Sequence, residues 1–233
     1  MRDWQDPPEQ TPKLVEGEVH VWRAKLLLPE QTLKKLSATL SPQEKKQAAA
    51  FKFEKDKDCY TASHGILRQL LGQYLSKAPE MLSFGLGEYG RPELAGSLTG
   101  SGLNFNLSHS GQLALFAFIW NMDVGVDVEE VRLVPEYQSI MARYFSLEER
   151  RLVEQLPEDH KEAAFLTAWS AKEAFLKAKG WGLTGAASLQ EHRALPQQLE
   201  HLEPGPGYKG AVVVLEENWE LHLFQLPWAP IPF

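Results

Sequence analysis

The chain has the sequence Gly125-Val126-Asp127-Val128-Glu129, in which apolar and acidic residues alternate. Alternation of this kind predicts a β-strand, where residues two apart point to the same face of a sheet. Asp127 and Glu129 therefore present two carboxylates on one face. An acidic pair that follows an apolar strand is also typical of a strand end that reaches water, so the pair alone leaves a purely structural role open.

A second informative stretch is Trp-Ser-Ala-Lys-Glu-Ala-Phe-Leu-Lys, which covers residues 169–177 and predicts a helix. Residues four apart are neighbours on a helix surface, so Trp169, Glu173 and Lys177 form one stripe. If that stripe faces the strand, three carboxylates and one ammonium group converge. Three oxygen ligands with room for water suit Mg²⁺ bound beside a substrate phosphate. A Glu–Lys pair at this spacing is equally typical of a solvated helix face.

Two further motifs lie upstream of these stretches. Residues 88–92 have the sequence Glu-Tyr-Gly-Arg-Pro, and residues 105–110 have the sequence Phe-Asn-Leu-Ser-His-Ser. With all four motifs in this order, the chain resembles the Sfp-type 4′-phosphopantetheinyl transferases, in the long form with two similar halves. The resemblance implies an α+β fold of two lobes related by a pseudo-two-fold axis, each a small antiparallel sheet packed with helices.

The resemblance also implies a division of labour between the two lobes. Residues 1–119 are expected to form the N-terminal lobe, which contributes the contacts to the phosphates and adenine of coenzyme A. Residues 120–233 are expected to form the C-terminal lobe, which carries the metal and catalytic residues. The two halves are expected to meet near residues 119–121, with the site between them, where clefts often form.

The activity implied by the resemblance is that of an enzyme, a 4′-phosphopantetheinyl transferase. Such an enzyme moves 4′-phosphopantetheine from coenzyme A, its substrate, to a Ser of an apo acyl or peptidyl carrier protein and releases 3′,5′-ADP. The implied cofactor is Mg²⁺, or Mn²⁺ in its place, held by Asp127, Glu129 and Glu173. The implied catalytic residues are Glu173 and Lys177. Lys177 would bind the diphosphate, and either Glu173 or a metal-bound water would take the Ser proton. Carrier activation of this kind serves lipid or secondary metabolite biosynthesis, and the sequence leaves the pathway open.

The contacts to coenzyme A include one departure from the family. The residues implied to bind it are Lys45, Lys46, Gly90, Arg91, Pro92, Ser108, His109, Lys172 and Lys177. Relatives commonly carry an Arg near position 59, where this chain has Cys59 beside Tyr60. A thiol cannot replace a guanidinium at the ribose 3′-phosphate. The lysines at positions 45, 46, 52, 55 and 57 all remain alternatives for that contact.

Composition bounds the class of protein and its partners. The 233-residue chain has a net charge of −7, 43% hydrophobic residues and a single Cys. An acidic balance disfavours general binding of nucleic acid, which requires a basic surface. A single Cys excludes an internal disulfide and agrees with a reducing cytoplasm. No apolar run is long enough to span a membrane, and the polar N-terminus predicts no signal peptide. We therefore expect a cytoplasmic protein, monomeric because its halves are paired, that binds neither nucleic acid nor membrane.

Two other classes of function fit part of the pattern. A Mg²⁺-dependent nuclease also combines acidic residues with a Lys, but it usually places the last acid and the Lys two apart on a strand. A non-catalytic coenzyme A-binding module is the second alternative. The presence of all three candidate metal carboxylates argues against such a decayed site.

A candidate docking surface for the carrier lies in residues 132–151. This segment combines four Arg residues with Ile140, Met141, Tyr144 and Phe145. Basic and apolar groups together suit the acidic, amphipathic helix of a carrier protein. Ordinary surface helices have a similar composition, so this interpretation stays open beside the plain structural one.

Local signals predict most of the secondary structure. Ser41-Pro42 is a helix start, Ser146 with Glu149 is a capping box, and Gly180 is a helix stop. Polar and Pro-rich ends, residues 1–17 and 227–233, are expected to lie outside regular structure. The expected strands are 19–28, 103–107, 113–120 and 124–128, with a C-terminal hairpin of 210–215 and 219–226. The expected helices are 42–53, 56–76, 147–156 and 163–179, and 87–102 is an expected loop.

Overall fold

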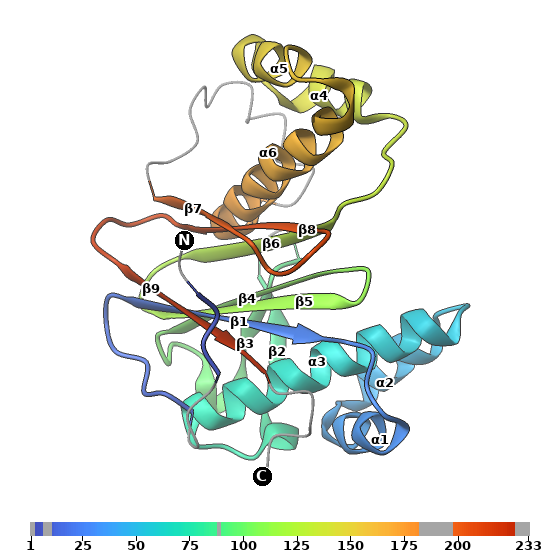
Figure 1. The fold of residues 1–233 in the computed structure, drawn as a ribbon. Coiled ribbons are helices and arrows are strands. Elements are labelled where there is room, and N and C mark those ends of the chain that lie inside the picture. The colour runs from blue at the N-terminus through green and yellow to red at the C-terminus, as the bar shows by residue number, and fades with distance from the viewer. Residues whose placement is uncertain (1–2, 7–10, 88–89, 182–197, 227–233) are drawn as a thin grey trace.

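The computed structural model describes residues 3–6, 11–87, 90–181 and 198–226, and these residues form four layers (Figure 1). Two sheets lie face to face in the middle, and a long helix covers the outer face of each. The long helices are α3, Glu54–Leu75, and α6, Glu158–Lys179. The lower layers in Figure 1 come mainly from the first half of the chain and the upper layers mainly from the second half.

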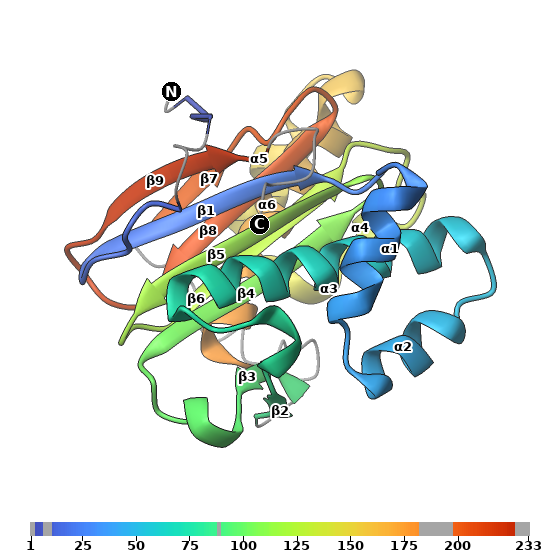
Figure 2. The ribbon, with the colours of Figure 1, turned by 90° about the horizontal axis from the view of Figure 1, so that it is seen from below.

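The larger sheet has the strand order β4-β5-β1-β9. Its strands are β1 (Glu18–Lys25), β4 (Leu103–Ser110), β5 (Leu113–Trp120) and β9 (Glu220–Gln225). Helices α1 (Glu30–Thr39) and α2 (Pro42–Ala49) flank α3 on the outer side of this sheet (Figure 2). A separate hairpin of β2 (Phe84–Leu86) and β3 (Pro92–Leu94) and the short 3₁₀ turns 79–81 and 96–98 connect α3 to β4.

The second sheet has the order β6-β8-β7, and both of its pairings are antiparallel. Its strands are β6 (Val124–Glu130), β7 (Leu199–Leu202) and β8 (Tyr208–Val214). Helices α4 (Tyr137–Tyr144) and α5 (Leu147–Glu154) follow β6 and pack against the first half of α6. The mixed α+β class predicted from the sequence is confirmed.

Strand β5 explains why the layers stack in this way. Its sequence, Leu-Ala-Leu-Phe-Ala-Phe-Ile-Trp, is apolar at every position, and it is buried on both faces. Phe116 and Phe118 point toward α3, whereas Leu115 and Ile119 point toward the second sheet. Full burial of side chains of this size stabilises the fold by about 1.5–3 kcal/mol each. Strand β5 therefore lies at the centre of the molecule and joins its two halves.

The C-terminal strands depart from the prediction. Strands β8 and β9 were expected to form a hairpin, which is wrong, because β8 pairs with β6 and β7 while β9 runs parallel to β1 in the other sheet. The division into residues 1–119 and 120–233 stays a prediction. Strand β9 belongs to the second of these ranges but lies in the sheet with β1, β4 and β5.

Other boundaries differ by smaller amounts. The helix expected over 42–53 ends at Ala49, and the expected loop 87–102 contains β3. Residues 88–89 of the first upstream motif, and Pro7, Pro8 and 227–233 of the chain ends, lie outside the described residues. None of the described helices is long and apolar enough to cross a membrane.

Candidate active site

Strand β6 divides its side chains between two environments. Val124, Val126 and Val128 are buried between the two sheets. Gly125, Asp127 and Glu129 alternate with them and therefore point to the other face, toward α6. At Gly125 a Cβ atom would collide with the backbone of Ala174 and Ala178 on α6. Glycine at this position thus allows the helix to lie directly on the strand beside Asp127.

Helix α6 brings its own functional groups to the same place. Its apolar residues Phe175 and Leu176 pack with the second sheet, and Trp169 packs with Phe145 and Phe165 nearer its start. The helix ends at Gly180, which takes a left-handed conformation with φ 69° that favours glycine. Glu173 and Lys177 lie within this anchored final half of the helix.

The predicted convergence of strand and helix is present for Asp127, Glu173 and Lys177. Lys177 Nζ lies 2.6 Å from Asp127 Oδ1 and 3.8 Å from Glu173 Oε2. Ser108 Oγ on β4 donates to Asp127 Oδ1 at 2.7 Å and accepts from Lys177 Nζ at 2.8 Å. A carboxylate, a hydroxyl and an ammonium group from three elements therefore form one hydrogen-bonded cluster.

A polar row on β4 joins the two sheets at this point. Asn106 Oδ1 accepts the backbone N–H of Val126 at 2.9 Å, and Ser110 Oγ donates to Glu129 Oε2 at 3.2 Å. Asn106, Ser108 and Ser110 are two residues apart along β4 and share one face. Hydrogen bonds of these side chains, rather than of the backbone, therefore connect β4 to β6. Asn106 and Ser110 were not among the predicted site residues, although they belong to the quoted motif at the same spacing as Ser108.

The carboxylates of the cluster repel one another. Burial raises the pKa of Glu173 to about 7, and the charge of Asp127 acts in the same direction, while Lys177 opposes both. Burial and the charge of Asp127 also raise the pKa of Glu129. One oxygen of Asp127, Oδ2, is buried and has no hydrogen-bond partner among the residues that the structure describes. A buried carboxylate oxygen without a partner is costly, and a cation beside it would offset that cost.

These observations fit the donor set expected for Mg²⁺. Three carboxylates and a hydroxyl supply only oxygen atoms, which are the ligands that Mg²⁺ prefers. Within the part of the chain that the structure describes, no three His, Cys, Asp or Glu side chains are already drawn together as a metal centre. Lys177 instead pairs with Asp127 and supplies the positive charge there. The oxygen donors are therefore of the type that Mg²⁺ binds, and the lysine occupies the position beside Asp127.

Several predicted coenzyme A residues lie apart from this cluster. Lys172 is buried, pairs with Glu149 on α5 at 2.9 Å and lies over the ring of Phe145. Lys45 and Lys46 are exposed on α2. Gly90, with φ 82°, lies in the connection between β2 and β3, and Pro92 is the first residue of β3. Arg91, between them, donates to Asp123 and to the carbonyl of Ala178 on α6.

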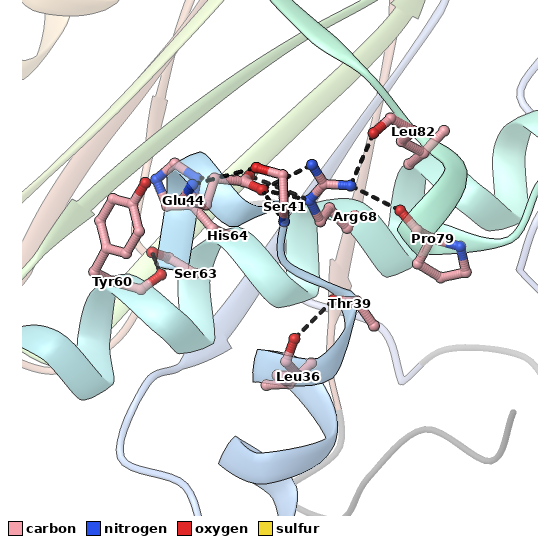
Figure 3. Close-up of polar contacts among 10 residues, drawn as sticks. All are labelled: Leu36, Thr39, Ser41, Glu44, Tyr60, Ser63, His64, Arg68, Pro79 and Leu82. Atoms are coloured by element: carbon pink, nitrogen blue, oxygen red, sulfur yellow. Dashed lines mark hydrogen bonds and ion pairs between the residues drawn. The ribbon is translucent and has the colours of Figure 1, made fainter. Parts of the chain in front are cut away.

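A second polar cluster surrounds Glu44 on α2 (Figure 3). Glu44 caps its own helix through Ser41 and pairs with Arg68 on α3 at 2.7 Å, while His64 lies 3.6 Å from its other oxygen. Burial favours a higher pKa for Glu44, but hydrogen bonds from His64, Arg68 and Ser41 outweigh it and lower the pKa to about 2. The carboxylate thus holds α2 against α3, and this acidic anchor lies next to Lys45 and Lys46 in the chain.

Two further predicted positions, His109 and Cys59, lie on β4 and α3. The side chain of His109 reaches solvent, yet desolvation by its surroundings lowers its pKa, with His64 and Lys177 acting in the same direction. Cys59 is buried and lies 3.7 Å from the carbonyl of Gly111. Burial also raises the pKa of the thiol. His109 therefore lies within electrostatic reach of Lys177 and His64, and Cys59 is a packed thiol whose ionisation is disfavoured by burial.

Comparison with known proteins places the chain among related enzymes. Residues 28–120 match the family model described as "4′-phosphopantetheinyl transferase, N-terminal", and residues 123–213 match the "4′-phosphopantetheinyl transferase superfamily". The chain is 37% identical over 212 residues to the 4′-phosphopantetheinyl transferase HetI of Nostoc sp., covering 91% of this chain and 88% of that protein.

Two further relatives match over a smaller share of their length. A putative 4′-phosphopantetheinyl transferase of Synechocystis sp. is 33% identical over 64% of this chain and 60% of its own. The L-aminoadipate-semialdehyde dehydrogenase-phosphopantetheinyl transferase of Mus musculus is 26% identical over 78% of this chain and 60% of its own. With both halves matched, and with HetI similar along nearly its whole length, the chain belongs to the 4′-phosphopantetheinyl transferase family.

Proposed function

We propose that this protein transfers the 4′-phosphopantetheine group of coenzyme A to a Ser hydroxyl of an apo carrier protein. The observation that carries the proposal is the cluster of Asp127, Ser108, Lys177 and Glu173, which the strand and the helix of the family motifs bring together. The cluster combines acidic oxygen donors with one ammonium group, the combination needed for a substrate that carries a diphosphate.

Asp127, Glu129 and Glu173 would hold Mg²⁺, with Mn²⁺ as the alternative. The ion would supply neutralisation of the diphosphate charge. Lys177 binds a diphosphate oxygen, and to do so it leaves Asp127 Oδ1, where it neutralises the carboxylate in the absence of metal. Ser108 keeps Asp127 oriented during this exchange, because its hydroxyl donates directly to Asp127 Oδ1. Ser110 orients Glu129 in the same way.

The transfer itself is a displacement at phosphorus. The carrier Ser oxygen forms a bond to the β-phosphorus of coenzyme A, and the bond between that phosphorus and the bridging oxygen breaks. The bonding electron pair leaves with the oxygen of 3′,5′-ADP. The Ser proton passes to Glu173, directly or through a water. Glu173 is the carboxylate that α6 contributes to the cluster. The residues chiefly position the reacting groups and compensate charge, as this kind of chemistry requires.

On this proposal, the nucleotide part of coenzyme A binds to the N-terminal lobe. His109 lies one residue beyond Ser108, and its imidazole is available to a phosphate from that position. Lys45 and Lys46 are exposed cations on the neighbouring helix and are candidates for the 3′-phosphate. The C-terminal lobe then contributes the metal ligands and Lys177, so that the reaction takes place where β4 meets β6.

The carrier protein is proposed to dock on α4 and α5. Met141 and Phe145, two of the apolar residues first considered for this surface, are buried in the core with Phe165 and therefore cannot contact a partner. The most exposed large apolar residues of this region are instead Leu133, Leu147 and Leu152, which are 79%, 65% and 62% exposed. Arg132 and Arg151 are exposed in the same segment. Basic groups interleaved with leucines suit an acidic, amphipathic helix. We propose a monomer as the active form.

The test is a transfer assay with the purified protein, Mg²⁺, coenzyme A and an apo carrier protein, read by the mass of the carrier. We expect the carrier to gain one phosphopantetheine group, and to gain none when its Ser is replaced by Ala or when EDTA removes the metal. Binding of coenzyme A without any mass change would support a non-catalytic module instead. Degradation of added nucleic acid would support a nuclease.

A further inference from the structure

The side chain of Arg91 connects three segments that lie far apart in the sequence. It belongs to the turn between β2 and β3, whose ends are held by hydrogen bonds from Gly87 N to Arg91 O and from Gly90 N to Gly87 O. Its Nη1 donates to Asp123 Oδ1 at 3.1 Å and to Ala178 O at 3.2 Å. Asp123 directly precedes β6, and Ala178 lies in the last turn of α6.

We propose that Arg91 is a positioning residue, a latch that fixes the end of α6 against the start of β6 and thereby sets the distance between Lys177 and Asp127. The proposal rests on the proposed function, since it concerns the same cluster. It assigns Arg91 a role different from the direct contact with coenzyme A that the resemblance implies.

The end of α6 shows why an outside donor is needed. The last four carbonyl groups of a helix have no partner within it. At α6, the N–H groups of Gly180 and Trp181 satisfy the carbonyls of Leu176 and Lys177. The carbonyl of Ala178 receives the guanidinium of Arg91 instead. A cation is also favoured at this position by the helix dipole, whose negative end lies at the C-terminus.

The aliphatic part of Arg91 adds a packing contact. A Cβ atom on Gly180 would lie 3.9 Å from Cδ of Arg91, so the side chain runs beside the residue that ends the helix. The side chain of Arg91 is 14% exposed, whereas that of Asp123 is 50% exposed. The contact with the helix end is therefore the sheltered part of the latch, and the ion pair with Asp123 is the part that water screens.

The latch lies close to the groups that it would position. Ala178 is the residue after Lys177 on α6, and Asp123 is four residues before Asp127 on β6, about 13 Å along the strand. Between them, the backbone of α6 contacts β6 at Gly125. Phe175 and Leu176 pack this half of α6 against the second sheet, and Arg91 adds a polar attachment at its last turn. That attachment keeps Lys177 in register with Asp127.

The two roles of Arg91 predict different kinetics. A phosphate-binding Arg would lower the KM for coenzyme A and would act independently of Asp123. A latch would instead affect turnover, because misplacement of Lys177 acts on the reacting groups rather than on initial binding. If Arg91 is a latch, replacing Asp123 should also lower turnover. A phosphate-binding role for Arg91 predicts no such effect, because the negative charge of Asp123 disfavours contact with a phosphate.

The experiment compares Arg91→Ala, Asp123→Ala and the double variant by steady-state transfer and by amide hydrogen exchange over residues 174–180. We expect kcat to fall about tenfold in Arg91→Ala, the usual scale for losing a charge-assisted hydrogen bond, with KM for coenzyme A unchanged. Asp123→Ala should lower kcat less than Arg91→Ala does. The double variant should have the same kcat as Arg91→Ala alone. Exchange over the end of α6 should become faster in all three variants.

Lys161→Ala is the matched control, because it removes an ion pair with Glu158 from the exposed first turn of the same helix. It should leave kcat and exchange over 174–180 as in the wild type. A raised KM in Arg91→Ala, with Asp123→Ala unaffected in both kcat and exchange, would overturn the latch in favour of phosphate binding. If the wild type transfers no phosphopantetheine, the proposed function fails, and the exchange measurement still decides the latch. If Arg91→Ala does not fold, Asp123→Ala alone carries the comparison.

Discussion

Replacing Lys177 with Met tests whether the lysine supplies the charge that a metal ion would otherwise provide. Methionine approximates the unbranched apolar stem of lysine but lacks the terminal ammonium group, so the charge and its hydrogen bonds are lost. Asp127 is 2% exposed and Lys177 is 28% exposed, so the variant leaves a buried carboxylate without its cationic partner. Breaking a fully buried pair in this way costs about 3–5 kcal/mol. The partial exposure of Lys177 reduces the expected loss to about 2–3 kcal/mol.

The assay is thermal unfolding in EDTA and in Mg²⁺, each with and without coenzyme A. In EDTA the variant should melt about 5–10 °C below the wild type, given the usual dependence of Tm on stability for a protein of this size. Mg²⁺ should raise the Tm of the variant more than that of the wild type, because only the variant lacks a cation at Asp127. Adding Asp127→Asn to the variant should restore stability in EDTA. Transfer should fall about 100-fold or more, the scale for losing one charge that stabilises the transition state.

Lys34→Met is the control, since it removes an exposed lysine paired with Glu30 at 2.6 Å on α1, a helix that contributes no residue to the candidate site. It should change neither the response to Mg²⁺ nor the transfer rate. The reasoning is refuted if Lys177→Met melts like the wild type in EDTA, or if Mg²⁺ stabilises both proteins equally. A large loss of stability with normal transfer would show instead that Lys177 is only a structural ion pair.

Three further predictions concern other parts of the chain. The pKa of Glu44 is lowered from 4.5 to about 2 in the folded state, so its ion pair with Arg68 stabilises the fold above pH 4.5 and is lost as the pH falls toward 2. Glu44→Gln should therefore flatten this part of the acid-unfolding profile measured in urea, and a profile as steep as that of the wild type would contradict it. Gly125→Ala should lower both Tm and transfer because its Cβ meets the backbone of α6, whereas Gly85→Ala, with its nearest contact at 3.6 Å, should be tolerated. Cys59→Arg should increase the preference for coenzyme A over its 3′-dephospho form by about tenfold in kcat/KM, and strong preference already in the wild type would show that other cations hold the 3′-phosphate.

Local sequence patterns were sufficient to predict several structural elements of this protein. The helix start at Ser41, the capping box at Ser146 and the helix stop at Gly180 are present as predicted, because they depend on residues within one turn of each other. The shared face of Asp127 and Glu129 followed from the two-residue period of a strand. The stripe of Glu173 and Lys177 followed from the helical period.

Only the tertiary structure decided which of these local elements meet. Strand β9 pairs with β1, the first strand of the chain, and no local signal distinguishes that partner from the adjacent β8. The same limit applies to side chains. Lys172 and Lys177 both follow from one helix motif, yet the helix turns Lys172 toward Glu149 and Lys177 toward Asp127. The sequence by itself therefore determined the elements and the chemistry they carry. The pairing of strands and the packing of helices decided which charges share a site, because those contacts join residues that are distant in the chain.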